Sequence, residues 1–305
     1  MKKLYHYPSM LILSIIASLF FVAALLLTYV TQVMLDPKFY LDVISEYHVD
    51  EALYDEVDTY FRQYSVPTEI PQEVFMKGFD KQELARTARH IAKLSLDYIL
   101  DPKAEEPKAE YDFTAFEKSV NDYYESYAEA NSIEKTDEYY SYKARTISIA
   151  EDKVNSLLDV MLVYKISGTS KAKLVHRFSP FIKWAAVGSA VMLVIILIVM
   201  FIINRHHTAD MPYWLGVIMF SGSGLLLIPS IYFRATGFFD GFFMTQPTVY
   251  RSFTGVIYKF IDSMIRINAV ICGIAVLLII LAQIIHVVRK HKAIKEIEKE
   301  RLEEE

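Results

Sequence analysis

Two histidines and an aspartate, His206-His207 with Asp210, are the residues of this sequence whose types most resemble a metal site. Two imidazoles and a carboxylate are ligands that bind divalent transition metals. The three residues lie in a short turn between two apolar stretches, and no second cluster completes a coordination shell. We therefore interpret them as polar residues of a turn and expect no metal ligand.

A second polar group consists of Gln283 and His286, one helical turn apart near the end of the last apolar stretch, with Asn268 at its start. Ionisable side chains inside a membrane span are functional candidates, because burial in hydrocarbon is costly. These lie near the ends, where they reach the interface. No Asp, Glu, Lys or Arg occupies the middle of any apolar stretch, which argues against ion-coupled transport.

The third group is acidic and consists of His48, Asp50, Glu51 and the pairs Asp55-Glu56 and Glu105-Glu106. General acid–base catalysis requires carboxylates that converge in a cleft, and adjacency along a helix gives no convergence. We expect solvated acidic faces. The sequence also has no nucleophile elbow, Gly-rich phosphate loop, HExxH or CxxC. It therefore predicts no enzyme, no catalytic residue and no cofactor.

The charges of the chain are unevenly distributed. Residues 36–180 carry 28 acidic and 18 basic side chains, a net charge of −10, whereas the remainder carries 9 and 14, a net charge of +5. No Lys/Arg stripe suits a phosphate backbone, so nucleic acid is excluded as a partner. The single cysteine, Cys272, forms no intramolecular disulfide. The acidic part must therefore fold around a hydrophobic core.

Apolar residues are gathered in four blocks, each as long as a membrane-spanning helix, which needs about 20 residues. The predicted transmembrane helices are 10–34, 181–204, 213–233 and 267–288. The first is about twice the apolar length of a signal peptide and has no A-x-A site. We expect it to be an uncleaved span, with lipid as the partner of all four blocks.

Basic residues near the ends of the blocks predict the orientation. The segments 1–9, 205–212 and 289–305 hold more Lys and Arg near the spans than the connection 234–266. Positive charge favours the cytoplasmic side. We expect a multi-pass protein of the plasma membrane with both termini in the cytoplasm and residues 35–180 outside.

Residues 35–180 show helical periodicity almost throughout. Apolar residues recur at spacings of three and four in 39–64, 84–99 and 113–127, and in a last helix from Thr136 to Tyr164. Asp80 is placed as an N-cap, and Lys103–Glu110 has the composition of a loop. The predicted fold is an all-α membrane protein with an extracytoplasmic helical bundle inserted between the first and second spans.

The connection 234–266 is unusually aromatic for a loop in water. Residues 249–265 read as an amphipathic helix with a basic polar face. We favour a location in the bilayer interface, and packing beneath the outward domain is the alternative. The residues that define this candidate interfacial segment are Phe238, Phe239, Phe242, Phe243, Arg251 and Lys259.

Small residues in the apolar blocks predict close helix packing. Small-xxx-small spacing allows two backbones to approach, within the chain or between chains. A pore constriction at the Ser-Gly patch 221–224 is the alternative. The candidate packing residues are Ala186, Ala190, Ser221, Gly224, Ala269 and Gly273.

The segments Leu35-Asp36-Pro37-Lys38-Phe39-Tyr40 and Pro71-Gln72-Glu73-Val74-Phe75, with Tyr47 and Tyr54 between them, resemble a pattern in uncharacterised bacterial four-span membrane proteins with one helical extracytoplasmic domain. The resemblance covers about the first third of the chain, implies a bacterial plasma membrane and brings no known activity.

The layout of one span, an outward domain and three further spans is similar to the permease halves of mechanotransmitting ABC systems. Their outward domains usually contain strands, and the cytoplasmic connection here, about 204–212, leaves little surface for an ATPase. This likeness is a fold-level analogy.

These observations lead to three hypotheses. The first is a non-enzymatic membrane protein, a sensor, scaffold or accessory subunit, whose helical domain binds a ligand, a lipid, a protein partner or a second copy. The second is a transport component, either a permease-like subunit or a small pore. The third is a membrane enzyme acting at the outer interface, near Phe238 to Arg251.

Overall fold

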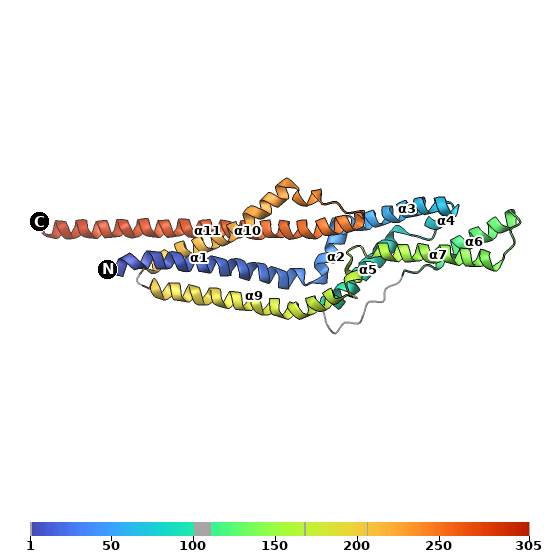
Figure 1. Cartoon of the computed structure of the whole chain (residues 1–305). Coiled ribbons are helices and arrows are strands. Elements are labelled where there is room, and N and C mark those ends of the chain that lie inside the picture. The colour runs from blue at the N-terminus through green and yellow to red at the C-terminus, as the bar shows by residue number, and fades with distance from the viewer. Residues whose placement is uncertain (1, 101–110, 168, 206, 305) are drawn as a thin grey trace. The chain divides into compact units, whose positions relative to one another are not determined.

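The structure, a computed structural model, describes residues 2–100, 111–167, 169–205 and 207–304 (Figure 1). Side chains are described except in 2–6, 167, 170–173, 176, 293 and 296–304. The predicted loop Lys103–Glu110, the pair Glu105-Glu106 and the predicted turn residue His206 lie outside the described residues.

Every regular element in these ranges is a helix, and none of the described residues forms a strand, which confirms the all-helical prediction. The helices up to residue 100 are α1 (Lys2–Tyr29), the π-helix η1 (Val30–Met34), α2 (Pro37–Glu46), α3 (Val49–Thr68), α4 (Gln72–Met76) and α5 (Lys81–Leu100). The later ones are α6 (Thr114–Ala130), α7 (Asp137–Leu158), α8 (Val163–Ser167), α9 (Ser170–Ile203), the 3-10 helix η2 (Thr208–Asp210), α10 (Met211–Thr236), the 3-10 helix η3 (Phe238–Gly241) and α11 (Pro247–Glu304).

The chain divides into two compact units. The first unit comprises Met1–Val33, Pro180–Phe238 and Tyr258–Glu305, and the second comprises Met34–Ser179 and Phe239–Ile257. Helices α9 and α11 contribute residues to both units.

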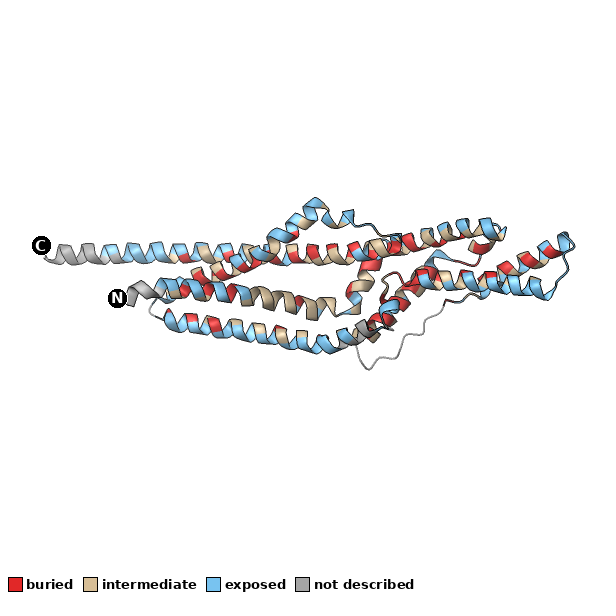
Figure 2. Ribbon diagram, viewed as in Figure 1, coloured by how far each residue is buried: buried red, intermediate tan, exposed pale blue. Residues whose placement is uncertain are grey.

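Within the described residues, four helical stretches are long and apolar enough to cross a membrane, as predicted. They are Tyr7–Met34, Arg177–Ile203, Thr208–Thr236 and Pro247–Lys292. Two of these helices extend well beyond the predicted limits: α9 begins at Ser170, and α11 runs without interruption from Pro247 to Glu304. Much of α9 and of the C-terminal half of α11 is exposed, which suits helices whose sides face lipid (Figure 2).

Small residues bring helices together in the first unit, at the predicted residue Ser221 and also at Gly216 and Gly222. A Cβ built on Gly222 would lie 2.6 Å from Cδ1 of Phe21, and one on Gly216 would lie 2.9 Å from the carbonyl oxygen of Ala275. The hydroxyls of Ser18 and Ser221 lie 2.7 Å apart. These contacts join α10 to α1 and to α11.

Of the candidate packing residues, Ala186 is buried, whereas Ala190, Ala269 and Gly273 are exposed. A Cβ on Gly224 or Gly273 would meet nothing within 4 Å. The spacing identifies a face that permits close approach, but it does not determine which face meets a neighbour in the same chain. For these exposed faces, contact with a second chain stays a prediction.

The two tryptophans of the first unit have opposite environments. Trp214 is buried, and its ring lies 5.5 Å from the rings of both Tyr7 and Tyr213. Trp184, on α9, is 75% exposed.

The second unit folds around an aromatic core. Phe61 of α3 is fully buried, and its ring centroid lies 5.0 Å from that of Phe75, 5.4 Å from that of Phe79 and 5.9 Å from that of Phe116. The Asp80 carboxylate accepts hydrogen bonds from the backbone amides of residues 82 and 83, as predicted for an N-cap of α5. Stacked rings supply large buried areas without a disulfide.

The helix predicted from Thr136 to Tyr164 ends earlier than expected. Helix α7 stops at Leu158, and Leu162 has a positive φ of 54°, a left-handed conformation that interrupts a helix. The buried Asp159 carboxylate accepts hydrogen bonds from the amides of Tyr164 (3.0 Å) and Lys165 (2.9 Å). This cap starts α8 and breaks the predicted helix in two.

The residues of the predicted connection divide between the units. In the second unit, the start of α11 packs against α2, because a Cβ on Gly255 would lie 2.8 Å from Cγ1 of Val43 and 2.9 Å from Cγ of Tyr47. Packing against the helical domain was the alternative to an interfacial location for this segment. The predicted boundary between 266 and 267 is not a helix end, since α11 continues through it.

Candidate functional site

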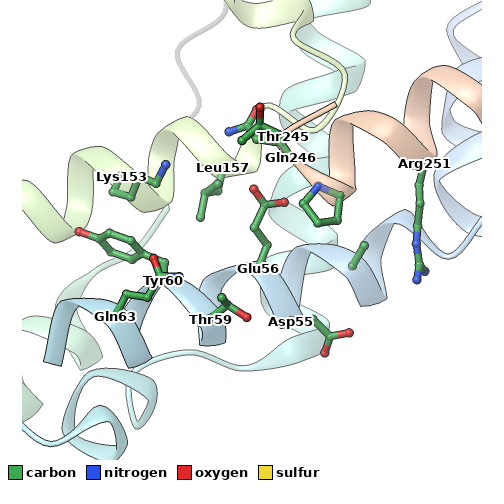
Figure 3. Close-up of a pocket in the computed structure, with 12 residues that line it drawn as sticks. Asp55, Glu56, Thr59, Tyr60, Gln63, Lys153, Leu157, Thr245, Gln246 and Arg251 are labelled. Atoms are coloured by element: carbon green, nitrogen blue, oxygen red, sulfur yellow. The ribbon is translucent and has the colours of Figure 1, made fainter. Parts of the chain in front are cut away.

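The second unit contains a cavity of about 560 Å³ between α3, α7 and residues 245–251 (Figure 3). A volume of this size is typical of small-molecule sites. Two of the walls are helices, and the third is the short segment that leads into α11. This pocket is the candidate functional site.

Helix α3 forms one wall because it is amphipathic. Leu53, Val57 and Phe61 are buried in the core. On the opposite side, polar residues follow at helical spacing and line the pocket: Asp55, Glu56, Thr59, Tyr60 and Gln63. The face that the sequence presents as merely solvated is therefore one side of a cavity.

Glu56 fixes the wall contributed by the start of α11. Its carboxylate accepts a hydrogen bond from the Thr248 hydroxyl at 2.6 Å and a longer one from the Thr248 amide at 3.3 Å. In Figure 3 the side chain rises from α3 toward the segment that holds Thr245 and Gln246. A carboxylate at a helix N-terminus also interacts favourably with the helix dipole.

Lys153 and Tyr60 face each other across the pocket from α7 and α3 (Figure 3). The Lys153 ammonium lies 5.8 Å from the centroid of the Tyr60 ring, a cation–π distance. Burial, followed by the nearby Tyr64 phenol, raises the pKa of Tyr60 to about 12. Tyr60 therefore stays neutral beside the lysine, and Leu157 provides a buried apolar floor.

Several polar side chains of the pocket keep hydrogen-bonding capacity for a ligand. Asp55, Thr59, Gln63 and Gln246 make no side-chain hydrogen bond or ion pair to any described residue. Among the described residues, the Lys153 ammonium contacts the Tyr60 ring and pairs with no carboxylate. The site thus combines a carboxylate, an ammonium and two amides, which suits a ligand bearing both positive and negative charge.

The candidate interfacial residues are divided between the two units. Phe238 and Lys259 belong to the first unit and the other four to the second. Phe239 and Phe242 stack at 5.8 Å, and Phe243 is 93% exposed. Contact of these rings with lipid stays a prediction.

Arg251, also predicted to be interfacial, lines the candidate site. Its guanidinium donates a hydrogen bond to the His48 carbonyl at 3.0 Å. A basic residue on the polar face of the amphipathic segment therefore helps to hold that segment in the second unit.

The acids near His48 take part in ion pairs between helices. Asp50 pairs with Arg89 at 2.9 Å, and Glu51 lies 3.9 Å from Lys81. Both pairs link the first turn of α3 to α5. These carboxylates link the two helices, and of the described acids singled out in the sequence only Asp55 and Glu56 line the candidate site.

The polar residues near the ends of the apolar blocks come together more closely than expected. Asp210, Gln283 and His286 line a cavity of about 250 Å³ in the first unit, together with Tyr7 and Trp214. Asn268 is elsewhere and fully buried, where its side-chain amide donates to the Met264 carbonyl at 2.8 Å.

Sequence reasoning missed Lys153, Gln63 and Gln246 as site residues. Gln63 lies about 90 residues before Lys153 in the sequence, and Gln246 lies about 90 residues after it. Each of the three is a residue type that is common on protein surfaces. Only tertiary packing brings them to one pocket. The one signal in the sequence was the pair Asp55-Glu56 on the polar face of α3. Because adjacency along a helix does not reveal a cleft, the sequence alone gave this pair no role.

Comparison with protein-family models, with curated proteins and with solved structures finds no match for this chain. The likeness to bacterial four-span proteins and to permease halves stays an expectation from the sequence.

Proposed function

We propose that this chain is a non-enzymatic protein of a bacterial plasma membrane whose helical second unit lies outside the cell and binds a small zwitterionic ligand. Four spanning helices hold it in the bilayer, and both termini are cytoplasmic. The observation that carries the proposal is the pocket lined by Asp55 and Lys153, whose opposite charges have no ionic partner among the described residues.

A free amino acid has the chemistry that fits this lining. Its ammonium would pair with the Asp55 carboxylate and its carboxylate with the Lys153 ammonium, while Gln63 and Gln246 offer amides to both groups. Charge-assisted hydrogen bonds are about twice as strong as neutral ones. A ligand with charge of only one sign would leave either Asp55 or Lys153 without an ionic partner.

Thermal unfolding of the full-length protein in detergent, with each common amino acid added in turn, tests the proposal. A ligand present at 100 times its Kd stabilises the folded state by about 2.7 kcal/mol. We expect at least one amino acid to raise the unfolding temperature of the wild type. Asp55→Asn and Lys153→Gln should each abolish most of that rise.

Two exposed residues of α6 provide matched controls. Lys118→Gln and Glu129→Gln make the same changes of charge outside the pocket and should keep the full response. The proposal fails if no amino acid stabilises the wild type, or if both pocket variants respond as the wild type does.

A further inference from the structure

A second cavity of the same unit, of about 340 Å³, is lined by four tyrosines and one acid. Tyr123, Tyr124 and Tyr127 come from α6 and Tyr142 from α7, while Glu69 follows the last turn of α3. None of these residues lines the candidate functional site. We refer to this cavity as the tyrosine pocket.

The rings are arranged as walls at nearly right angles. Tyr123 and Tyr127, four residues apart on α6, are stacked with centroids 5.9 Å apart. Tyr124 is perpendicular to Tyr123, at 77°, and to Tyr142, at 76°. Aromatic faces carry negative quadrupole density, so rings in two perpendicular planes create a corner that attracts a cation.

Hydrogen bonds hold the inner rings in place. The Tyr123 hydroxyl donates to the Glu69 carbonyl at 3.2 Å. The Tyr124 hydroxyl contacts Thr146 Oγ1 at 3.3 Å, and Tyr124 is only 8% exposed. Burial raises the pKa of both phenols, so both stay neutral. Fixed rings reduce the conformational entropy that a ligand must overcome.

The charge that lines the pocket is negative, as a cation requires. Glu69 is the single charged side chain among the described residues that line it. The neighbouring tyrosines already hold one ammonium of the protein itself: Lys143 Nζ lies 5.4 Å from the Tyr140 ring centroid and 6.0 Å from that of Tyr139. The same part of the bundle thus uses cation–π contacts within the fold.

We infer that the tyrosine pocket binds a quaternary ammonium group, as carried by choline. A quaternary ammonium has no N–H donor, so aromatic faces and a carboxylate are its natural partners, whereas a primary amine would seek hydrogen-bond acceptors. The choline headgroup of a lipid has the same cation joined to a phosphate. With Glu69 as the only charge of the lining, the free solute is favoured over the phosphate-bearing form.

The test is a titration of the full-length protein with choline in a maltoside detergent that contains no choline group. Ligand-observed saturation-transfer NMR follows the N-methyl protons. The control ligand is 3,3-dimethylbutan-1-ol, which has the shape of choline without the charge. We expect choline to bind at least tenfold more tightly, as several cation–π contacts require. Glycerophosphocholine, the soluble lipid headgroup, should bind more weakly than choline.

Variants of the exposed rings separate a binding role from a structural one. Tyr127→Leu and Tyr142→Leu should each weaken choline binding about fivefold. Tyr127→Phe keeps the aromatic face and should bind within about twofold of the wild type. Tyr164→Leu, at an exposed tyrosine of the same unit outside the pocket, should have no effect.

Three results would overturn the inference: no saturable choline binding, equal affinity for choline and its neutral isostere, or unchanged affinity in both leucine variants of the pocket. If glycerophosphocholine binds more tightly than choline, the ligand is a lipid headgroup and the preference for a free solute is wrong. Because the two pockets share no residue, the amino-acid response of the candidate site is an independent result.

Discussion

Single residues of the second unit show how burial changes the chemistry of acidic groups. Burial, followed by the neighbouring Glu117 carboxylate, raises the pKa of Glu151 to about 7, and Asp152 adds to the effect. No cation is among the causes. Glu151 is therefore an acid that the folded state keeps protonated at a pH where water would ionise it.

This acid makes the stability of the protein depend on pH. Between about pH 4.5 and pH 7 the folded state binds a proton that the unfolded state has lost, so the free energy of unfolding falls as pH rises through this window. We expect Glu151→Gln to remove that dependence and to raise the free energy of unfolding at pH 8 by about 1 kcal/mol. Unfolding temperatures measured from pH 4.5 to pH 8 check this.

The exposed Glu129→Gln is the control for that measurement and should keep the wild-type pH profile. Parallel curves for the wild type and Glu151→Gln would show that the raised pKa of Glu151 does not contribute to stability.

At the residue scale, the sequence identifies which groups are charged but not which of them meet. Asp55 and Glu56 stand out in the sequence, and Lys153 does not. Their common pocket depends on α7 returning beside α3 and on the start of α11 closing a third side. No local pattern encodes such a meeting, because each residue type also suits a solvated surface.

At the element scale, periodicity and caps predict most helices well. Apolar spacing identified α3, α5 and α6, the predicted N-cap Asp80 caps α5, and the last helix of the bundle starts at Thr136–Asp137 as predicted. The sequence was less informative about where helices end and which helices pack against each other. The end of α7 depends on the buried Asp159, whose carboxylate satisfies two amides of the next helix. A lone aspartate in an apolar-periodic stretch gives no sign of this in the sequence.

Two glycines of α11 allow the effect of close packing on stability to be distinguished from the effect of helix propensity, because only one of them is tightly packed. We expect Gly255→Ala to destabilise the second unit by about 1–3 kcal/mol, because the new methyl group would overlap Val43 and Tyr47. Gly273→Ala, on the same helix with nothing within 4 Å, should be neutral or stabilising by up to about 1 kcal/mol. Thermal unfolding and amide hydrogen exchange of residues 247–257 in both variants check this.

If the two substitutions cost the same, the packing of the start of α11 against α2 is not a source of stability. Faster exchange in 247–257 confined to Gly255→Ala would place the effect at that contact.

At the scale of the whole molecule, charge and hydropathy divide the chain in the same way as its compact units. The acidic stretch 36–180 forms most of the second unit, and the apolar blocks form most of the first. This division was predictable, because a bilayer requires long apolar helices and water requires a polar surface. Residues 239–257 belong to the second unit despite their aromatic composition, and that could be learned only from their packing.

The single cysteine makes the membrane topology directly testable. In a Cys272→Ala background, we expect Glu134→Cys to react with a membrane-impermeant maleimide in intact cells, because Glu134 is an exposed residue of the second unit, which we propose lies outside the cell. Thr208→Cys, in the short turn between α9 and α10, should react only after the membrane is opened. The reverse pattern would place the acidic unit in the cytoplasm.

The distribution of tryptophan gives each unit its own optical signal. Both tryptophans, Trp184 and Trp214, lie in the first unit, whereas the second unit has tyrosine as its emitting side chain. Excitation at the red edge of aromatic absorption therefore reports on the first unit alone. The exposed Trp184 senses the surrounding lipid or detergent, and the buried Trp214 senses helix packing. Unfolding of the first unit can therefore be followed by itself in an unlabelled sample of the whole protein.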